Sequence, residues 1–201
     1  MEENKKLLLH ACCCHCSAYT IKHWKELGYD ITVFWYNPNI HPFTEHQERL
    51  VALRKMSEIQ DFKLIEYDGY DIEDFFKLTA EKPKDRCYYC FTMRLSKAAE
   101  AATKLQNEFF SSTLLISPLQ RHDLLELVGK EQNDKSNSTF LYEDLRKHYS
   151  ESRRITKPLG LYTQQYCGCV LSEWERYRDY PPKDRAELYA SVDPARRYLC
   201  D

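Results

Sequence analysis

Eight of the nine cysteines in this 201-residue chain lie in three tight clusters. In chain order the clusters are Cys12, Cys13, Cys14 and Cys16; Cys87 and Cys90; and Cys167 and Cys169. A thiolate is both a soft metal ligand and a redox group, so several thiols brought together favour zinc or an iron–sulfur cluster. The spacing therefore indicates metal chemistry in preference to structural packing.

Two of the cysteine pairs have Cys-x-x-Cys spacing, Cys13 with Cys16 and Cys87 with Cys90. Together they supply four sulfur ligands, a number that fits a structural zinc ion and a [4Fe–4S] cluster equally well. The pairs of a zinc ribbon usually stand about 15–20 residues apart, whereas about 70 residues separate Cys16 from Cys87. This separation favours a functional cofactor assembled across the fold. A Cys-x-x-Cys pair at a helix start is also typical of a dithiol redox centre, and that alternative stays open for Cys13 and Cys16.

The third pair flanks a glycine, in the order Cys167-Gly168-Cys169, so that both thiols can face one metal. With this pair the number of thiols exceeds what one tetrahedral site requires. We therefore expect a four-thiolate cluster and a second ion whose remaining ligand is a carboxylate. Asp71 and Asp144 both follow predicted strands, and we favour Asp144, although acidic residues at strand ends also cap helices.

Three other residues near the first cluster have more than one interpretation. His10 and His15 flank it. Each has three alternative roles: to donate a proton, to orient a metal ligand, or to occupy a hydrogen-bonded structural position. Cys14 has the alternative role of a small packed hydrophobe. A disulfide framework is not expected in a reducing cytosol, and adjacent cysteines have poor geometry for bonding to each other.

The composition indicates one modest hydrophobic core, with 43% hydrophobic side chains in 201 residues. The apolar stretch 7–9 is too short for a signal peptide, and no run approaches the ~18 apolar residues of a membrane helix. We therefore expect a cytoplasmic protein without a membrane partner. Only five glycines occur, and none forms a Gly-rich phosphate turn, which disfavours nicotinamide, flavin and nucleotide triphosphate cofactors.

The formal net charge of −2 gives no support for nucleic-acid binding, but the local charge distribution does. Between Arg146 and Lys157, five lysine and arginine side chains stand against one acid, Glu151. This pattern is typical of a short face that contacts phosphates, and it is equally typical of a solvated helix and loop.

Short apolar runs alternate with longer amphipathic segments along the chain. The runs predicted to be strands are 7–10, 31–36, 62–67, 112–116 and 140–142. The segments predicted to be helices are 17–27, which ends at the C-cap Gly28; 44–60, where Thr44 and Gln47 form a capping box; 72–78, 88–105 and 119–129. Strands separated by helices in this rhythm predict an α/β fold, a parallel sheet covered on both faces in three layers.

In such sheets the working site lies beyond the carboxyl ends of the strands. The first predicted strand runs into the first cysteine cluster, the second into Asn37-Pro38-Asn39, and the fifth into Glu143 and Asp144. We expect thiol and polar groups to converge at this edge. After Lys157 the pattern changes, so we divide the chain into an α/β catalytic domain, residues 1–170, and a C-terminal helical extension, residues 171–201.

Six motifs occur in order along the chain. They are Leu-Leu-Leu-His-Ala-Cys-Cys-Cys-His-Cys-Ser (7–17), Tyr-Asn-Pro-Asn-Ile-His-Pro (36–42), Arg-Cys-Tyr-Tyr-Cys-Phe-Thr-Met-Arg-Leu (86–95), Ser-Thr-Leu-Leu-Ile-Ser-Pro (112–118), Tyr-Glu-Asp (142–144) and Leu-Tyr-Thr-Gln-Gln-Tyr-Cys-Gly-Cys (161–169). In this order they closely resemble the QueH-type epoxyqueuosine reductases, over roughly residues 6–175. Cys14, Cys200 and the tail after Ser172 depart from the family pattern.

The resemblance implies an adenine-nucleotide-hydrolase-like (HUP-type) sheet and an oxidoreductase of tRNA modification, which reduces the epoxide of epoxyqueuosine at the wobble position to give queuosine. It also implies a [4Fe–4S] cluster and a neighbouring mononuclear iron. The thiols that correspond to the family's are Cys12, Cys13, Cys16, Cys87, Cys90, Cys167 and Cys169. Of these we favour, for the cluster, Cys12, Cys13, Cys87 and Cys90.

The residues expected to be catalytic, through the second ion, are Cys16, Cys167, Cys169 and Asp144. The base must leave the anticodon stack, and we expect Asn37 and Asn39 to line its pocket while Arg153 and Arg154 hold the tRNA backbone. The implied partners are tRNA with a GUN anticodon and an unidentified electron donor. A zinc-stabilised binding module and a metal-free dithiol oxidoreductase are the two alternatives.

Overall fold

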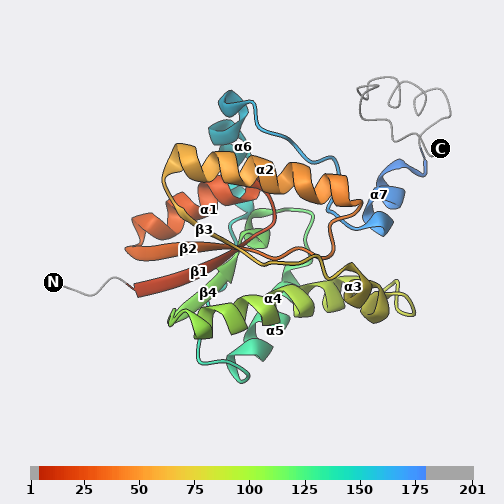
Figure 1. Ribbon diagram of the computed structural model, residues 1–201, viewed down its shortest axis with the longest axis horizontal. Helices are drawn as coiled ribbons and strands as arrows, with labels where there is room; N and C mark the ends of the chain where they lie inside the picture. The colour runs from red at the N-terminus through yellow and green to blue at the C-terminus, as the bar shows by residue number, and fades with distance from the viewer. Residues whose placement is uncertain (1–4, 180–201) are drawn as a thin grey trace.

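The computed structural model describes residues 5–179, and its centre is one parallel sheet of five strands. The strand order is β3-β2-β1-β4-β5 (Figure 1). The strands are β1 (Lys5–Ala11), β2 (Tyr29–Trp35), β3 (Lys63–Glu66), β4 (Phe109–Ser112) and β5 (Thr139–Phe140). The prediction of a parallel α/β sheet is confirmed.

The central strand β1 explains why the sheet needs helices on both faces. Leu7, Leu8 and Leu9 are all fully buried, as expected for a strand covered on both sides. Successive side chains of a strand point to opposite faces. Leu8 accordingly packs in one core with Phe110 of β4 and side chains of α4 and α5, while Leu7 and Leu9 pack in a second core with α1 and α2.

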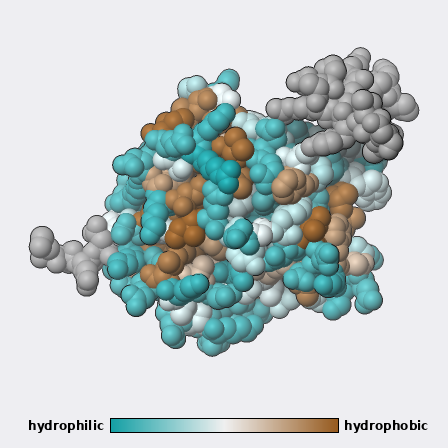
Figure 2. Space-filling model, in the orientation of Figure 1, coloured by the Kyte–Doolittle hydropathy of each residue, from teal (hydrophilic) through white to brown (hydrophobic). Residues whose placement is uncertain are grey.

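The described residues include seven α-helices. They are α1 (Cys14–Glu26), α2 (Phe43–Gln60), α3 (Ile72–Thr79), α4 (Arg86–Lys104), α5 (His122–Asn133), α6 (Tyr149–Thr156) and α7 (Val170–Tyr177). Helices α1, α2 and α6 lie on one side of the sheet, and α4 and α5 lie on the other (Figure 1). Hydrophilic side chains cover most of the face seen in Figure 2, and hydrophobic ones form separate patches.

The predicted strand 112–116 is wrong in its position. The strand β4 ends at Ser112, and Thr113–Ile116 forms a 3₁₀ helix. The side chain of Ser112 accepts a hydrogen bond from the Leu114 amide at 3.2 Å, which caps the turn. All four residues of the 3₁₀ helix are buried, and a short buried apolar run has no periodicity that separates a strand from a helical turn.

The predicted capping box of the second helix is also absent. Helix α2 begins at Phe43, with Pro42 at the N-cap and without a side-chain cap. The backbone of Pro42 is already fixed at φ −67°, so the helix starts before Thr44 reaches a capping position. Gln47 instead contacts the ring of His46 at 3.3 Å.

The structure describes little of the predicted C-terminal extension. Helix α7 begins at Val170, and Cys200 and the other residues from 180 to 201 lie outside the described residues. The boundary at residue 170 stays a prediction. Within residues 5–179, none of the helices has the length and apolar character needed to cross a membrane.

Candidate metal centre

The first cysteine cluster lies at the carboxyl end of β1, the strand from which the sheet extends in both directions. Strand β1 pairs with β2 on one side and with β4 on the other. The connections after β1 and β4 therefore diverge, which leaves a crevice where ligands bind in open α/β sheets. The backbone amide of Cys12 donates to Thr113 Oγ1 at 3.1 Å, and Thr113 donates to the Cys12 sulfur at 3.4 Å. The first residue after β4 thus supports the first cysteine directly.

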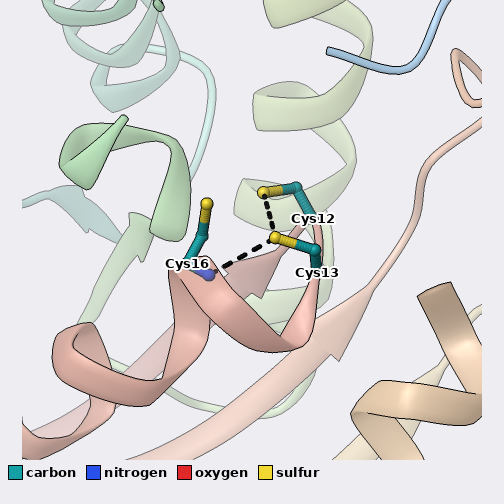
Figure 3. A group of neighbouring side chains, drawn as sticks. All are labelled: Cys12, Cys13 and Cys16. Atoms are coloured by element: carbon teal, nitrogen blue, oxygen red, sulfur yellow. Dashed lines mark hydrogen bonds between the residues drawn. The ribbon is translucent and has the colours of Figure 1, made fainter. Parts of the chain in front are cut away.

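Three thiols converge at this point (Figure 3). The sulfur atoms of Cys12, Cys13 and Cys16 all lie within 4.8 Å of one another, and all three residues are buried. Cys13 is the N-cap of α1, and its sulfur accepts a hydrogen bond from the Cys16 amide at 3.3 Å. The helix starts three residues earlier than predicted, and this start brings both sulfurs of the Cys-x-x-Cys pair to one side. We call these three residues the thiol triad.

The three thiols of the triad differ in proton affinity because they contact one another. Hydrogen bonds from Cys13 and then Cys16 lower the pKa of the Cys12 thiol well below its usual value, and the charge of Arg94 acts in the same direction. The same contacts with Cys12 raise the pKa values of Cys13 and Cys16. A cation bound by all three sulfur atoms would displace these protons, since metals bind thiolates.

Cys14 does not join the triad. Its sulfur lies 3.7 Å from the carbonyl oxygen of Tyr162, and it packs in the core formed by α1 and α2. Burial raises the pKa of the Cys14 thiol to about 12. These surroundings support the interpretation of Cys14 as a small packed side chain.

The two remaining cysteine pairs lie near each other, although they are far apart in sequence. Cys87 and Cys90 belong to the start of α4, and Cys167 and Cys169 belong to the segment that enters α7. Burial raises the pKa values of the Cys87 and Cys90 thiols, to about 12 for Cys90, and the charges of Cys167 and Cys169 add to the rise in both. We call these four residues the second thiol group. Their sulfur atoms are less closely packed, since within residues 5–179 only the triad has three ligand atoms within 4.8 Å of one another.

A pocket of about 220 Å³ opens beside the triad. Thiols, cations, amides and aromatic rings share its wall. The side chains that matter for chemistry are Cys12, Cys16 and Cys167; Arg49, Arg153 and Arg176; Gln120 and Gln164; and His15, Tyr149 and Tyr166. The pocket therefore combines metal-ligating groups with groups that contact phosphate and bases.

Two glutamine side chains in the pocket wall donate to sulfur. Gln164 Nε2 lies 3.0 Å from the Cys13 sulfur, and Gln120 Nε2 lies 3.2 Å from the Cys167 sulfur. The other end of the Gln164 amide, Oε1, is buried without a hydrogen-bond partner. A buried acceptor without a donor is costly, so Gln164 is suited to receive a donor from a bound molecule. Neither glutamine was predicted from the sequence. Gln164 lies within the motif 161–169, which was its only signal, and Gln120 lies outside the six motifs.

Asn37 and Asn39 are each 2% exposed, and neither side chain is part of the pocket wall. Asn37 donates to the Ala11 carbonyl at 2.8 Å and accepts from Arg94 at 2.8 Å. It therefore connects β1 to α4. Asn39 Oδ1 is buried without a hydrogen-bond partner.

The charged residues predicted for the site lie at different places. Asp144 is 42% exposed in its side chain and pairs with Arg146, whose hydrogen bonds hold the pKa of the Asp144 carboxyl below its usual range. Its side chain is not part of the pocket wall, whereas Arg153 is. Arg154, the next residue of α6, is exposed and outside that wall. Asp71 accepts a hydrogen bond from Tyr36 Oη at 2.9 Å.

Comparison with known proteins connects this geometry with a family. The family model described as epoxyqueuosine reductase QueH matches residues 7–175. The protein named epoxyqueuosine reductase QueH from Dehalococcoides mccartyi is 51% identical over 172 residues, which cover 86% of this chain and 94% of that protein. The protein of the same name from Thermotoga maritima is 38% identical over 181 residues, which cover 85% of this chain and 91% of that protein.

Among solved structures, the U34-tRNA thiolase NcsA from Methanococcus maripaludis with its [4Fe–4S] cluster has a similar fold. The TM-score is 0.58 at 12% identity, and the match covers 100% of this chain and 77% of that chain. At this identity the likeness concerns the fold alone, and it agrees with the α/β architecture described above. Since the family model spans most of the chain and both relatives exceed 30% identity, the chain belongs to the QueH family of epoxyqueuosine reductases.

Proposed function

We propose that this protein reduces the epoxide of epoxyqueuosine in tRNA to the ring alkene of queuosine. Family membership supports the proposal, and the observation that carries it is the buried thiol triad beside a pocket with basic walls. Removal of the epoxide oxygen consumes two electrons and two protons and releases water. The site must therefore hold a redox group, limit the access of bulk water and admit a nucleotide.

The close spacing of the triad supports a single ion there. Sulfur ligands at about 2.3 Å from a tetrahedral ion stand roughly 3.8 Å apart, and the sulfurs of Cys12 and Cys13 are 3.8 Å apart. The thiolates of a [4Fe–4S] cluster each bind a different iron and so stand further apart. We therefore assign the mononuclear iron to Cys12, Cys13 and Cys16, which leaves one coordination position for another ligand.

The second thiol group has the number of ligands that a [4Fe–4S] cluster needs. We assign the cluster to Cys87, Cys90, Cys167 and Cys169. This division differs from the one favoured on sequence grounds, in which Cys12 and Cys13 belong to the cluster. When bound, the cluster supplies electrons one at a time, and the ion acts as a Lewis acid toward the epoxide oxygen.

The residues around the triad then have distinct roles. Gln164 holds the Cys13 thiolate through Nε2, and its Oε1 accepts a hydrogen bond from the substrate. Burial and the charge of Arg153 lower the pKa of His15, so His15 is neutral near pH 7 and positions Thr163, 2.7 Å away, instead of donating a proton. Asp144 is the carboxylate predicted to complete the coordination of the ion. To do so, it would have to break its hydrogen bonds with Arg146.

The walls of the pocket suggest how tRNA binds. The modified base leaves the anticodon stack and enters beside Tyr149, while Arg153 and Arg176 contact phosphates. Asn37 and Asn39, predicted to bind the base, support the site from behind this wall. The substrate is tRNA with a GUN anticodon, the set in which queuosine replaces the wobble base, and a separate electron donor reduces the cluster.

The test is anaerobic purification, iron and sulfide quantification, and turnover of tRNA that carries epoxyqueuosine. We expect about five irons and four sulfides per chain, from one cluster and one ion. Cys16→Ala should lose turnover and about one iron but keep its sulfide, and Cys87→Ala should lose sulfide. Cys14→Ala is the matched control and should keep both.

Two results would contradict the proposal, the first its reaction and the second its metal centre. Zinc without sulfide, in a colourless protein that does not reduce the epoxide, would support a binding module. Turnover that persists after complete removal of metal would support a dithiol oxidoreductase.

A further inference from the structure

The segment that carries Cys167 and Cys169 is anchored by one buried arginine of α2. Arg49 Nη1 donates to the Cys167 carbonyl at 2.9 Å, and Nη2 donates to the Tyr166 carbonyl at 3.0 Å. Its Nε donates to Glu45 Oε1, one turn earlier on the same helix, at 2.7 Å. Arg49 is 1% exposed and Glu45 is 8% exposed. A buried ion pair thus faces the backbone of the cysteine segment.

Stability alone is a weak reason for this pair. Removing two charges from water costs several kcal/mol per ion, and well-packed apolar residues often stabilise a core as well or better. A guanidinium is planar and rigid, so binding two consecutive carbonyls fixes the orientation of the peptide between Cys167 and Gly168. Its ring contact with Tyr166, 5.6 Å from the guanidinium carbon to the ring centre, adds a further constraint.

Other contacts hold the same segment to the same place. The amide of His41 donates to the Gly168 carbonyl at 2.8 Å, and the hydroxyl of Tyr166 donates to the His41 carbonyl. The hydroxyl of Tyr162 donates to Glu45, the partner of Arg49. The Glu45–Arg49 pair therefore lies at the centre of a network that joins α2 to the whole segment before Cys169.

The charge of Arg49 also reaches both groups of thiols. Arg49 interacts electrostatically with Cys12 and Cys13 of the triad and with Cys167 of the second group. A positive charge near a metal–thiolate centre favours its reduced form, which carries one more electron. Glu45 has the opposite effect because of its negative charge.

We propose that Arg49 is a positioning residue for the metal centre: it holds the Cys167-Gly168-Cys169 segment against the α4 thiols, and its charge, balanced by Glu45, sets the reduction potential. The inference rests on the metal centre proposed above, but not on the reaction. Iron binding and backbone protection report on it even if the substrate is different.

The test compares Arg49→Lys, Arg49→Gln and Glu45→Gln in the anaerobically purified full-length protein. Iron and sulfide per chain, hydrogen exchange of the His41 amide, and the midpoint potential of the centre are measured. The matched controls are Arg54→Lys and Arg54→Gln, because exposed Arg54 lies on the same helix and pairs with Glu66 at 2.7 Å instead of with the segment.

Both Arg49 variants should bind less iron and sulfide, and the His41 amide should exchange roughly tenfold faster, as expected for the loss of about one hydrogen bond. Centres that remain should have a more negative potential in Arg49→Gln than in Arg49→Lys, which keeps the charge. Glu45→Gln keeps an acceptor for Nε and should shift the potential in the positive direction. Partial unfolding would not shift the potentials of Arg49→Gln and Glu45→Gln in opposite directions. The test therefore holds even where an Arg49 variant folds poorly.

Unchanged metal content and unchanged exchange in Arg49→Lys and Arg49→Gln would overturn the positioning role. Equal potentials in the wild type, Arg49→Gln and Glu45→Gln would overturn the electrostatic role. If the wild type bound no iron, the proposed metal centre would fail, while exchange at His41 would still show whether Arg49 holds the segment.

Discussion

At the scale of single residues, the candidate site was largely visible in the sequence because sulfur is rare and its clusters are distinctive. Seven thiols were predicted to be ligands, and the structure places the triad together and the two remaining pairs near each other. Their division was not predictable, because it depends on which side of α1 and α4 each sulfur faces. Arg49 and Gln164 were missed since an arginine or a glutamine has no comparable signal in one sequence.

Gly168 lies between the two cysteines of the third pair, at a position where a side chain does not fit. Its φ of +149° is a conformation that other residues rarely adopt, and an added Cβ would lie 3.1 Å from Asn39 Nδ2 and 3.2 Å from Ile40 Cγ1. Gly168→Ala should therefore cost about 1–3 kcal/mol in backbone strain and displace the flanking thiols. We expect a lower iron content per chain and a lower melting temperature, measured under anaerobic conditions.

The matched control for this substitution is Gly160→Ala. Gly160 also has a positive φ, +60°, but nothing lies within 4 Å of an added Cβ. This variant should lose about 1–2 kcal/mol of stability and keep its iron. Equal iron contents in the two variants would contradict the role given to Gly168.

At the scale of helices and strands, alternation of apolar runs and amphipathic segments was enough to predict the parallel sheet. The errors lie at element ends, where a particular hydrogen bond decides the outcome. Helix α1 begins at Cys14 because the sulfur of Cys13 caps it, and β4 ends at Ser112 because the hydroxyl of Ser112 caps the next turn. The periodicity of apolar residues carries no information about such local contacts. Both of these caps lie next to the thiol triad.

Helix α5 packs against the short strand β5 through a glycine. A Cβ on Gly129 would lie 2.1 Å from Cδ1 and Cε1 of Phe140, which is 6% exposed. In an exposed helix, Gly→Ala stabilises by about 1 kcal/mol, but overpacking of a core costs about 1–3 kcal/mol. Because the overlap here is severe, we expect Gly129→Ala to destabilise the protein by about 1–2 kcal/mol in urea unfolding.

A second substitution tests the cause of this loss. Adding Phe140→Leu to Gly129→Ala should recover part of the stability, since the smaller side chain makes room for the new methyl group. A double variant less stable than the sum of the two single effects would show that overlap with the ring is not the reason.

Helix α2 packs on β2 through a histidine that the fold keeps neutral. Trp35 Nε1 donates to His46 Nε2 at 3.1 Å. Burial, and then the charge of Arg49, lower the pKa of His46 from 6.5 to about 4. Between these two values the unfolded chain binds the proton and the folded chain does not, so stability falls as the pH decreases through this range.

His46→Gln keeps an acceptor for Trp35 but does not titrate. Between pH 7.5 and pH 5, the wild type should lose about 2 kcal/mol more free energy of unfolding than this variant. Urea unfolding at the two pH values measures the difference. An identical pH dependence in both proteins would show that His46 keeps an ordinary pKa in the folded state.

At the scale of the whole molecule, the fold brings together chemistry that is dispersed in the sequence. The residues that follow β1, the residues that follow β4 and the segment before α7 all line one pocket, and the thiols at the start of α4 interact with those of that segment. Sequence order predicted that thiols and polar groups would converge at the carboxyl edge of the sheet. It did not predict which basic residues of the segment 146–157 reach the pocket, because that depends on how α6 packs against α1.

The net charge of −2 means that tRNA must be attracted by a local surface and not by the molecule as a whole. Arg153 and Arg154 are adjacent on α6, and successive residues of a helix point about 100° apart. Of these two arginines, Arg153 alone belongs to the pocket wall. The two positions therefore allow a comparison in which the net charge changes equally and the place of the charge differs.

Arg153→Glu should weaken tRNA binding strongly, because the substituted side chain repels the phosphates that the arginine attracts. It should also reduce the salt dependence of the binding constant by about 0.7 for each phosphate that the protein no longer neutralises. Arg154→Glu has the same change in net charge and should have a smaller effect on both quantities. Binding measured at several salt concentrations separates the two variants, and equal slopes for Arg153→Glu and the wild type would remove Arg153 from the tRNA surface.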